Sequence, residues 1–230
     1  MAPTPLDVPL LDVADLACRR GGRPVFARLS FALGAGELLA LTGRNGSGKT
    51  TLLRALALLV RAEVGTILWQ GADVQDDPET WRGRLAWLGH LDGLKGDLTV
   101  RENLLGAERL RGEPTADDRL DLALVAYDLN ALAHRPVRTL SAGQRRRTAL
   151  ARVMLTQAAL WLLDEPLNAL DAPAQQAFRT VLQQHLAHGG LAIAATHADL
   201  GVPGARMLEL GSSSSPPSGG EEHERREVAA

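Results

Sequence analysis

The sequence predicts an α/β fold with a helical block inserted into it. Short apolar segments that end in glycine or acidic residues alternate with segments of helical periodicity. A glycine-rich turn separates one of these apolar segments from a helical one. Residues 91–138 differ from the rest because they combine many charges with apolar positions at helical spacing. The alternation outside this block is typical of a core in which helices cover a sheet.

The expected strands are short and mostly apolar. They are placed at residues 8–18, 25–33, 36–43, 65–71, 84–89, 159–165, 191–197 and 206–210. In the second strand apolar residues alternate around Phe26, Leu29 and Phe31, as in a half-buried strand. The segments 159–165 and 191–197 are apolar almost throughout, which is typical of strands buried on both faces.

Helices are expected between these strands. They run from Lys49 to about residue 59, from Ser141 to about residue 156, and from about Pro173, which suits a first helical turn, to residue 188. The block 91–138 is expected to be mostly helical. The segment 211–230 is rich in Ser, Gly and Pro and then charged, so it cannot bury enough apolar surface to order itself. One domain over 1–210 with a disordered tail is expected.

Composition narrows the class of protein. The net charge of −2 gives no basic footprint for nucleic acid, and the 45% apolar content supports a sizeable core. The single cysteine, Cys18, excludes an intrachain disulfide, fits a cytosolic compartment and is expected in the core. No apolar run approaches the ~20 residues that cross a bilayer. The first residues lack the basic start of a signal peptide, so a role at a membrane would require docking on it.

A phosphate-binding loop is predicted between the third strand and the first helix. The residues GRNGSGKT (43–50) fit the pattern G-x-x-x-x-G-K-[ST], although a chance glycine-rich turn is the alternative. Glycines let successive N–H groups point at phosphate oxygens, and the helix N-terminus adds positive potential. Lys49 is expected to reach the β- and γ-phosphates, and the Thr50 hydroxyl to ligate Mg²⁺. The nucleotide-binding residues expected here are Gly43, Arg44, Asn45, Gly46, Ser47, Gly48, Lys49, Thr50 and Thr51.

Two acidic residues follow the apolar segment 159–163. Asp164 is expected to hold Mg²⁺ directly or through water from the end of a buried strand. Glu165 is expected to polarise the water that attacks the γ-phosphate. Two adjacent acids can also mark the start of a loop, but the phosphate loop favours the catalytic interpretation.

The segment LSAGQRRRTALAR (140–152) has two interpretations. Ser141 and Gln144 fit a capping box, and a capped helix N-terminus is also an anion site. Residues 140–144 also resemble the LSGGQ signature of the ATP-binding cassette (ABC) ATPases, with Ala142 in place of a glycine. The resemblance covers about residues 8–210. It implies a P-loop NTPase of the ABC ATPase type, with a mixed sheet core and an inserted helical subdomain at about 91–138. The arginines 145–147 are expected to be ordinary surface and structural residues.

In that family two cassettes pair head to tail, and the signature of one closes over the γ-phosphate held by the other. The resemblance therefore implies that Ser141, Gly143 and Gln144 contact ATP bound to a second copy. Asp171 in LNALD resembles the aspartate of the D-loop, which faces the partner. His197 stands where the family has a switch histidine that contacts the γ-phosphate, so it joins Glu165 as a catalytic residue.

His90 stands at a strand end where most cassettes have the glutamine of the Q-loop. A neutral imidazole can accept or relay a hydrogen bond much as an amide does. Residues 89–95 and 98–104, with GTILWQG, LSAGQRRR and ALWLLDEP, resemble the ATPase subunit of the haem exporter of cytochrome c biogenesis, the CcmA type. Where the family usually stacks an aromatic residue on adenine, this chain has Arg20. Arg20 could stack its guanidinium on the base, Phe26 could help, or the loop could simply be solvated.

The resemblance implies an ATPase that uses ATP and Mg²⁺ and powers transport through separate integral membrane subunits, most simply haem export. It also implies a head-to-tail dimer, peripheral on the cytoplasmic face of the inner membrane, with no nucleic acid partner. An ABC ATPase with another cargo would share every nucleotide motif. A soluble ABC protein acting on ribosomes or DNA is less compatible with 230 residues, because those types carry two cassettes or long coiled coils.

Overall fold

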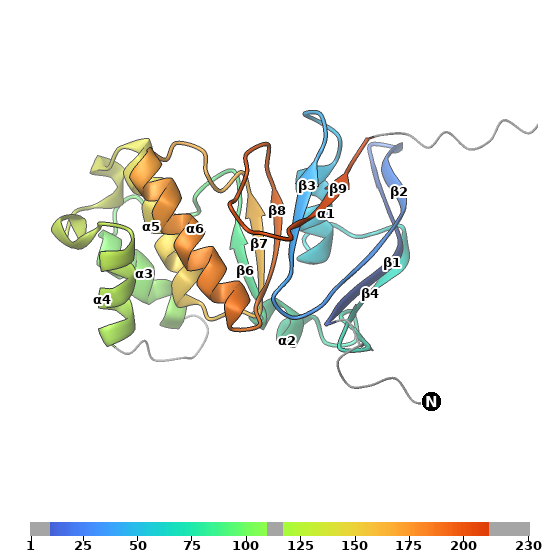
Figure 1. Ribbon diagram of the computed structural model, residues 1–230, viewed down its shortest axis with the longest axis horizontal. Helices are drawn as coiled ribbons and strands as arrows, with labels where there is room; N and C mark the ends of the chain where they lie inside the picture. The colour runs from blue at the N-terminus through green and yellow to red at the C-terminus, as the bar shows by residue number, and fades with distance from the viewer. Residues whose placement is uncertain (1–9, 110–116, 212–230) are drawn as a thin grey trace, which may run out of the picture.

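A computed structural model describes residues 10–109 and 117–211, which form two sheets and the helices around them (Figure 1). The strands are β1 (Leu11–Arg20), β2 (Arg23–Leu33), β3 (Leu38–Thr42), β4 (Val64–Trp69), β5 (Ala72–Asp73), β6 (Leu85–Leu88), β7 (Leu160–Asp164), β8 (Leu191–Ala195) and β9 (Arg206–Glu209). The helices are α1 (Lys49–Leu56), α2 (Pro78–Gly83), α3 (Val100–Arg109), α4 (Asp117–Ala126), α5 (Ala142–Leu155) and α6 (Ala172–Ala187). Short 3₁₀ turns occupy Asn130–Leu132 and Val137–Thr139.

A five-stranded parallel sheet forms the centre of the molecule, in the order β6-β7-β8-β3-β9. Every residue of β7 and β8 is buried, as expected for strands covered on both faces. Because parallel strands end at the same edge of a sheet, the segments that follow β3, β6, β7 and β8 lie close together. These are the segments that contain the predicted phosphate loop, His90, Glu165 and His197.

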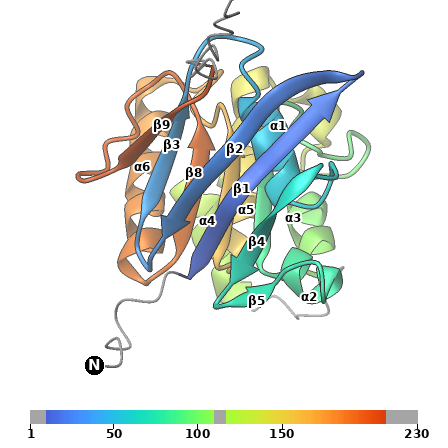
Figure 2. The ribbon, with the colours of Figure 1, turned by 90° about the vertical axis from the view of Figure 1, so that its right-hand side faces the viewer.

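A second, antiparallel sheet has the order β2-β1-β4-β5. Figure 2 shows this sheet in front of α1, which lies between it and the parallel sheet. Helix α1 fills the space between the sheets with Leu52, Leu53 and Leu56, none of which is exposed. Cys18 on β1 belongs to the same core and is also fully buried, as the sequence predicts.

Helices α3, α4 and α5 form a group at one end of the molecule, at the left of Figure 1. Their core contains the fully buried Val100, Leu104 and Leu120, with Tyr127 after α4. Helix α5 also packs against the parallel sheet, as α6 does on the same side (Figure 1). Helix α5 therefore connects the helical group to the strand ends. Within the described residues, no helix is both long and apolar enough to cross a membrane.

The structure corrects some expected boundaries. Residues 91–99 of the expected helical block contain no helix, because their backbone is held by side chains of later helices. The Asn103 amide, for example, accepts from the N–H of Lys95 at 2.8 Å and donates to its carbonyl at 3.0 Å. The short helix α2 was not expected from the sequence, although Asp77 caps it and Pro78 occupies its first turn. Of the expected tail, residues 212–230 lie outside the described part of the chain.

Candidate functional site

The phosphate loop leads from β3 into α1, and two of its glycines are required by the backbone. Gly43 has φ +126°, and a Cβ there would meet the carbonyl oxygen of Leu210. Gly48 is the N-cap of α1 with φ +104°, and a Cβ there would lie 2.6 Å from the Val25 side chain. Only glycine adopts these conformations without strain, so the sequence pattern and the backbone agree. The loop ends at the N-terminus of α1, where the helix favours an anion.

Lys49 is the first residue of α1, and its ammonium points back into the loop. Nζ donates to the carbonyl oxygens of Gly43 at 2.6 Å and Arg44 at 3.3 Å. It also lies 3.3 Å from Nε2 of His197, which therefore acts as an acceptor because an ammonium has no free lone pair. None of these partners is negatively charged, although only 8% of Lys49 is exposed. A buried cation with neutral partners is suited to receive a phosphate.

The polar atoms next to Lys49 fit a phosphate with a magnesium ion. Ser47 Oγ is buried and has no hydrogen-bond partner, so it is a free donor beside the loop. Thr50 Oγ1 donates to Oδ2 of Asp164 at 2.9 Å, which joins the start of α1 to the end of β7. A hydroxyl and a carboxylate supply the hard oxygen ligands that Mg²⁺ prefers. Thr50 and Asp164 are thus the residues that could hold the ion.

Glu165 follows β7 in a left-handed conformation, with φ +48°. Such conformations are sparsely populated for residues other than glycine and cluster at active sites. Its N–H donates to the carbonyl of Ala195 at 2.8 Å, so the neighbouring strand β8 fixes its backbone. Its Oε1 lies 3.8 Å from Nε2 of His197. Glu165, His197 and Lys49 therefore meet at one edge of the parallel sheet.

These residues line one cavity of about 970 Å³. Its walls are formed by Arg20, Val25, Asn45, Gly46, Ser47, Gly48, Lys49, Thr50, Thr51, Arg54, His90, Asp164, Glu165, Asn168, His197 and Ala198. Gly43 and Arg44 lie behind the loop and contact Lys49 through their carbonyls. The cavity wall contains Arg20 and Val25 but no aromatic residue other than histidine. Arg54 and Asn168 were not singled out from the sequence.

The predicted signature residues line a different cavity of about 260 Å³, bounded by Ser141, Gly143, Gln144, Arg147, Ala169, Leu170, Asp171 and Ala174. The capping box is present: Ser141 Oγ accepts from the N–H of Gln144 at 3.2 Å, and Gln144 Oε1 accepts from the N–H of Ser141 at 2.9 Å. Asp171 caps α6 through the N–H of Ala174. The two cavities share no residue. Within one copy, the signature is therefore separate from the phosphate loop.

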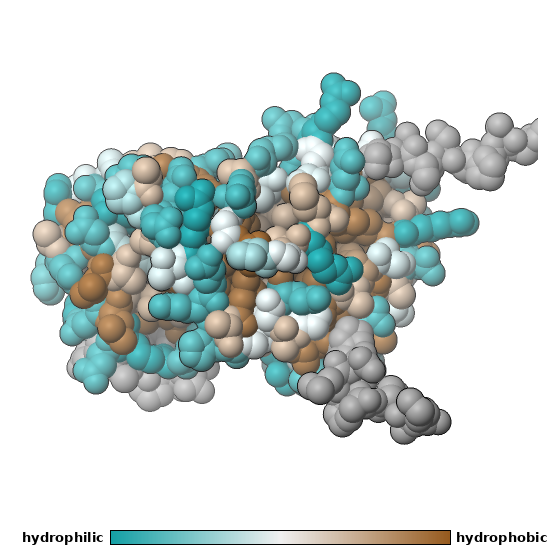
Figure 3. Space-filling model, viewed as in Figure 1, coloured by the Kyte–Doolittle hydropathy of each residue, from teal (hydrophilic) through white to brown (hydrophobic). Residues whose placement is uncertain are grey.

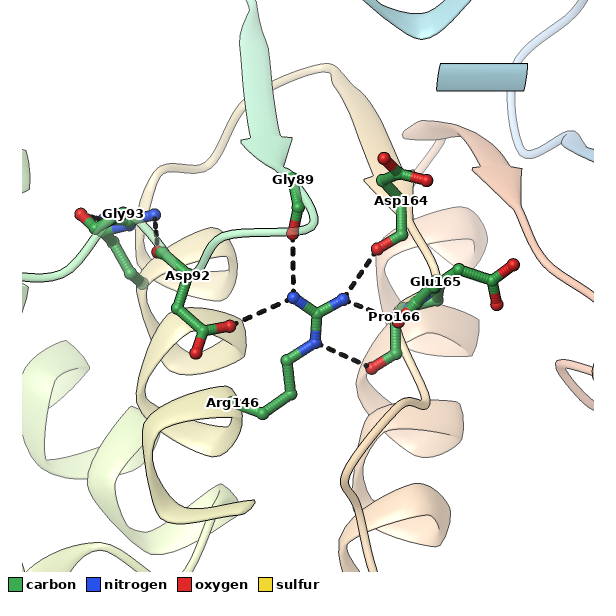
Figure 4. A network of polar contacts seen from close by, with 8 residues as sticks. Gly89, Asp92, Gly93, Arg146, Asp164, Glu165 and Pro166 are labelled. Atoms are coloured by element: carbon green, nitrogen blue, oxygen red, sulfur yellow. Dashed lines mark hydrogen bonds and ion pairs between the residues drawn. The ribbon is translucent and has the colours of Figure 1, made fainter. Parts of the chain in front are cut away.

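Arg146 is the functional candidate that the sequence interpretation missed. It was expected to be an ordinary arginine, yet only 4% of it is exposed, and it bridges α5 to two strand ends (Figure 4). It lies four residues before Leu150 and seven before Val153, both buried, so helical periodicity could have placed it on the inner face.

Sequence comparison matches this chain to one family and to relatives that cover most of its length. The ABC transporter family matches residues 26–168. A cytochrome c biogenesis ATP-binding export protein CcmA from Cupriavidus necator is 46% identical over 204 residues, which cover 89% of each chain. The protein of that name from Ruegeria sp. is 47% identical over 88% of this chain and 91% of its own length.

Solved structures agree in fold. The ATP-binding subunit of an ABC transporter superposes with a TM-score of 0.76 at 28% identity, over 82% of this chain and 80% of the other. A putative ABC transporter ATP-binding protein from Pyrococcus furiosus gives the same TM-score at 23% identity, over 87% and 96%.

Proposed function

This chain belongs to the ABC transporter family, and from that premise we propose that it is the ATP-hydrolysing subunit of the haem exporter of cytochrome c biogenesis. The nucleotide-binding ATPase activity follows from the family. The export role is supported by the CcmA proteins that are 42–47% identical over most of the chain. The observation that carries the proposal is the single cavity in which Lys49, Thr50, Asp164 and Glu165 converge.

We propose that the cavity cleaves the bond between the γ-phosphorus and its bridging oxygen. Lys49 neutralises the phosphates, with Ser47 and the loop N–H groups as further donors. Glu165 orients the water and accepts one of its protons as the water oxygen bonds to the γ-phosphorus, while the bond to the bridging oxygen breaks and ADP departs with that oxygen. His197 contacts the γ-phosphate from the end of β8. Thr50 and Asp164 are the proposed Mg²⁺ ligands, and the ion would offset charge on the phosphate oxygens.

We further propose that the complete site forms between two copies. Ser141 lies at the N-terminus of α5, where a helix favours an anion, but its own cavity contains neither Lys49 nor Glu165. A head-to-tail pair would place Ser141, Gly143 and Gln144 of one copy against nucleotide held by the other. Asp171 borders the same cavity and would lie at this interface.

The cavity wall offers the adenine base an arginine in place of the aromatic residue that is usual in the family. Arg20 lies on the cavity wall with Val25 and Arg54, and we propose that its guanidinium stacks on the base. His90, which is exposed, also lines this cavity, and by the family resemblance it takes the place of the Q-loop side chain. It is proposed to relay a hydrogen bond at the phosphates.

The membrane subunits are proposed to contact the helical group. Hydrophilic residues cover most of the face in Figure 3, with hydrophobic residues between them. On α4, Leu122 and Val125 are each 61% exposed and lie one turn apart, so they form an apolar contact on one side of the helix. Docking there would hold the protein at the cytoplasmic face of the inner membrane.

Two measurements test the proposed function. Lys49→Ala should abolish ATP binding, and Glu165→Gln should keep binding while lowering turnover by about 10²–10⁴-fold. Wild-type hydrolysis by either variant would contradict the assignment. Purification of the full chain from native membranes, followed by identification of the co-purifying integral membrane proteins, tests the export role. Subunits of a transporter for another cargo would support the alternative, and ribosomal proteins or DNA would contradict both.

A further inference from the structure

We propose that Arg146 is a positioning residue for ATP hydrolysis, which fixes the backbone of Glu165 and the loop of His90 and ties both to the signature helix. The inference rests on the proposed function, because it assigns a role toward the same hydrolytic residue. Arg146 itself does not line the nucleotide cavity. It acts through the segments it holds.

The guanidinium of Arg146 donates to oxygens from both strand ends that border the cavity (Figure 4). Its acceptors are Gly89 O at 2.9 Å and Asp92 Oδ1 at 3.1 Å from Nη1, Asp164 O at 2.7 Å and Glu165 O at 2.6 Å from Nη2, and Pro166 O at 3.4 Å from Nε. The rigid planar fork of arginine can bond several acceptors at fixed angles, which the single ammonium of lysine cannot do.

These bonds bear directly on the conformation of Glu165. Its left-handed backbone is unfavourable for a residue with a side chain, so the surroundings must impose it. The N–H is held by Ala195 of β8, and the carbonyl accepts from Arg146. Both sides of the residue are thereby fixed. The direction of the Glu165 carboxylate toward the cavity depends on this restraint.

A second arginine of α5 holds the same loop after β6. Arg152 donates from Nη2 to the carbonyl of Asp92 at 2.8 Å and from Nη1 to that of Gly93 at 2.6 Å. The loop that contains His90 is therefore attached to α5 at two points. Only Arg146 of this pair also contacts the segment of Glu165. A variant of Arg152 thus removes one attachment of the loop to α5 but keeps the bonds of Arg146 to the segment of Glu165.

Helix α5 connects Arg146 to the signature serine. Helix α5 begins after Ser141, and Arg146 lies little more than one turn farther along the same helix. Engagement of Ser141 by nucleotide on a second copy would move α5 as a rigid element. Arg146 would transmit that movement to Glu165 and to the loop of His90. Hydrolysis would consequently respond to the arrival of the second copy.

The test compares full-length variants below their melting temperatures. Arg146→Gln is expected to lower kcat by about 10–100-fold while KM for ATP changes less than about twofold, as for lost partners of site residues. Arg146→Lys should recover only part of kcat, because it keeps the charge without the fork. The control Arg138→Gln removes an exposed arginine that pairs with Asp97, and it should behave as wild type. Arg152→Gln should lower kcat less than Arg146→Gln does.

The decisive comparison is made in the Glu165→Gln background. There, Arg146→Gln should lower the residual turnover by less than about twofold, because the carboxylate that it positions is gone. Three results would overturn the proposal: the same fold-decrease in kcat in both backgrounds, a wild-type kcat for Arg146→Gln, or a raised KM with an unchanged kcat. If Arg146→Gln does not fold, the same cycle with Arg146→Lys decides. If wild-type protein fails to hydrolyse ATP, the proposed function fails, and Arg146 is not the cause.

Discussion

The substitution Ser141→Ala separates the structural role of the signature serine from its proposed role toward a second copy. Within one copy, the hydroxyl caps α5 by accepting from the N–H of Gln144 at 3.2 Å. The reciprocal bond from the Ser141 N–H to Gln144 Oε1 does not involve the hydroxyl and is kept. Loss of such a cap costs about 1 kcal/mol. For a chain of this size that lowers the melting temperature by about 2–4 °C.

The effect on turnover should be much larger. A hydrogen bond to a charged group contributes about 1.5–3 kcal/mol. If Ser141 makes the proposed contact with the γ-phosphate held by a second copy, its loss should slow hydrolysis by roughly 10- to 100-fold. ATP affinity of the single copy should not change, because Ser141 lies outside the nucleotide cavity. Steady-state ATPase rates, ATP titration and thermal unfolding together measure the three effects.

Asp77→Ala is the matched control. Asp77 caps α2 by accepting from the N–H of Thr80 at 3.1 Å, and it lines neither cavity. Its removal should lower the melting temperature by a similar amount and leave the ATPase rate unchanged. A Ser141→Ala protein that loses stability but hydrolyses ATP like wild type would refute the role of Ser141 toward a second copy.

Three further predictions concern other residues. His90→Gln should keep most of the turnover, since an amide can make the same hydrogen bonds; a folded but inactive variant would show that the imidazole has its own chemistry. Thr50→Val removes the bond to Asp164 and a proposed Mg²⁺ ligand, so the Mg²⁺ concentration for half-maximal hydrolysis should rise at least about tenfold, and an unchanged Mg²⁺ titration would count against that ligand. Burial lowers the pKa of His185, which stacks on Trp161, with His188 as a smaller cause. As the pH falls below about 6.5, the unfolded chain therefore binds more protons than the folded chain, and the free energy of unfolding should decrease. Urea titrations at several pH values should show a smaller decrease for His185→Gln than for wild type, and an equal decrease would exclude His185 as the source.

The sequence predicted those parts of the site whose residues are adjacent in the chain. The phosphate loop needs glycines, Lys49 and Thr50 at consecutive positions before a helix, and the backbone confirms the need at Gly43 and Gly48. Strands β7 and β8 were predicted because strands buried on both faces are apolar throughout. In each case a local pattern has a local physical cause.

Contacts across the fold could not be predicted in this way. The acceptors of Arg146 lie 18 to 57 positions away in the chain, so helical periodicity can place Arg146 on the inner face of α5 but cannot identify the groups that it binds. The loop at 91–99 lacks a helix because distant side chains bind its backbone. The separation of the signature cavity from the nucleotide cavity also depends on tertiary packing, and before the structure only the family resemblance implied it.

The proposed composite site between two copies is tested most directly by mixing two inactive variants. A Lys49→Ala chain cannot hold nucleotide, and a Ser141→Ala chain cannot supply the signature. In a mixed dimer, the nucleotide cavity of the Ser141→Ala chain faces the intact signature of the Lys49→Ala chain, which makes one complete site of two. Equal mixing makes half the dimers mixed, so ATPase activity should recover to about a quarter of wild type. A mixture no more active than the mean of its components would contradict the composite site.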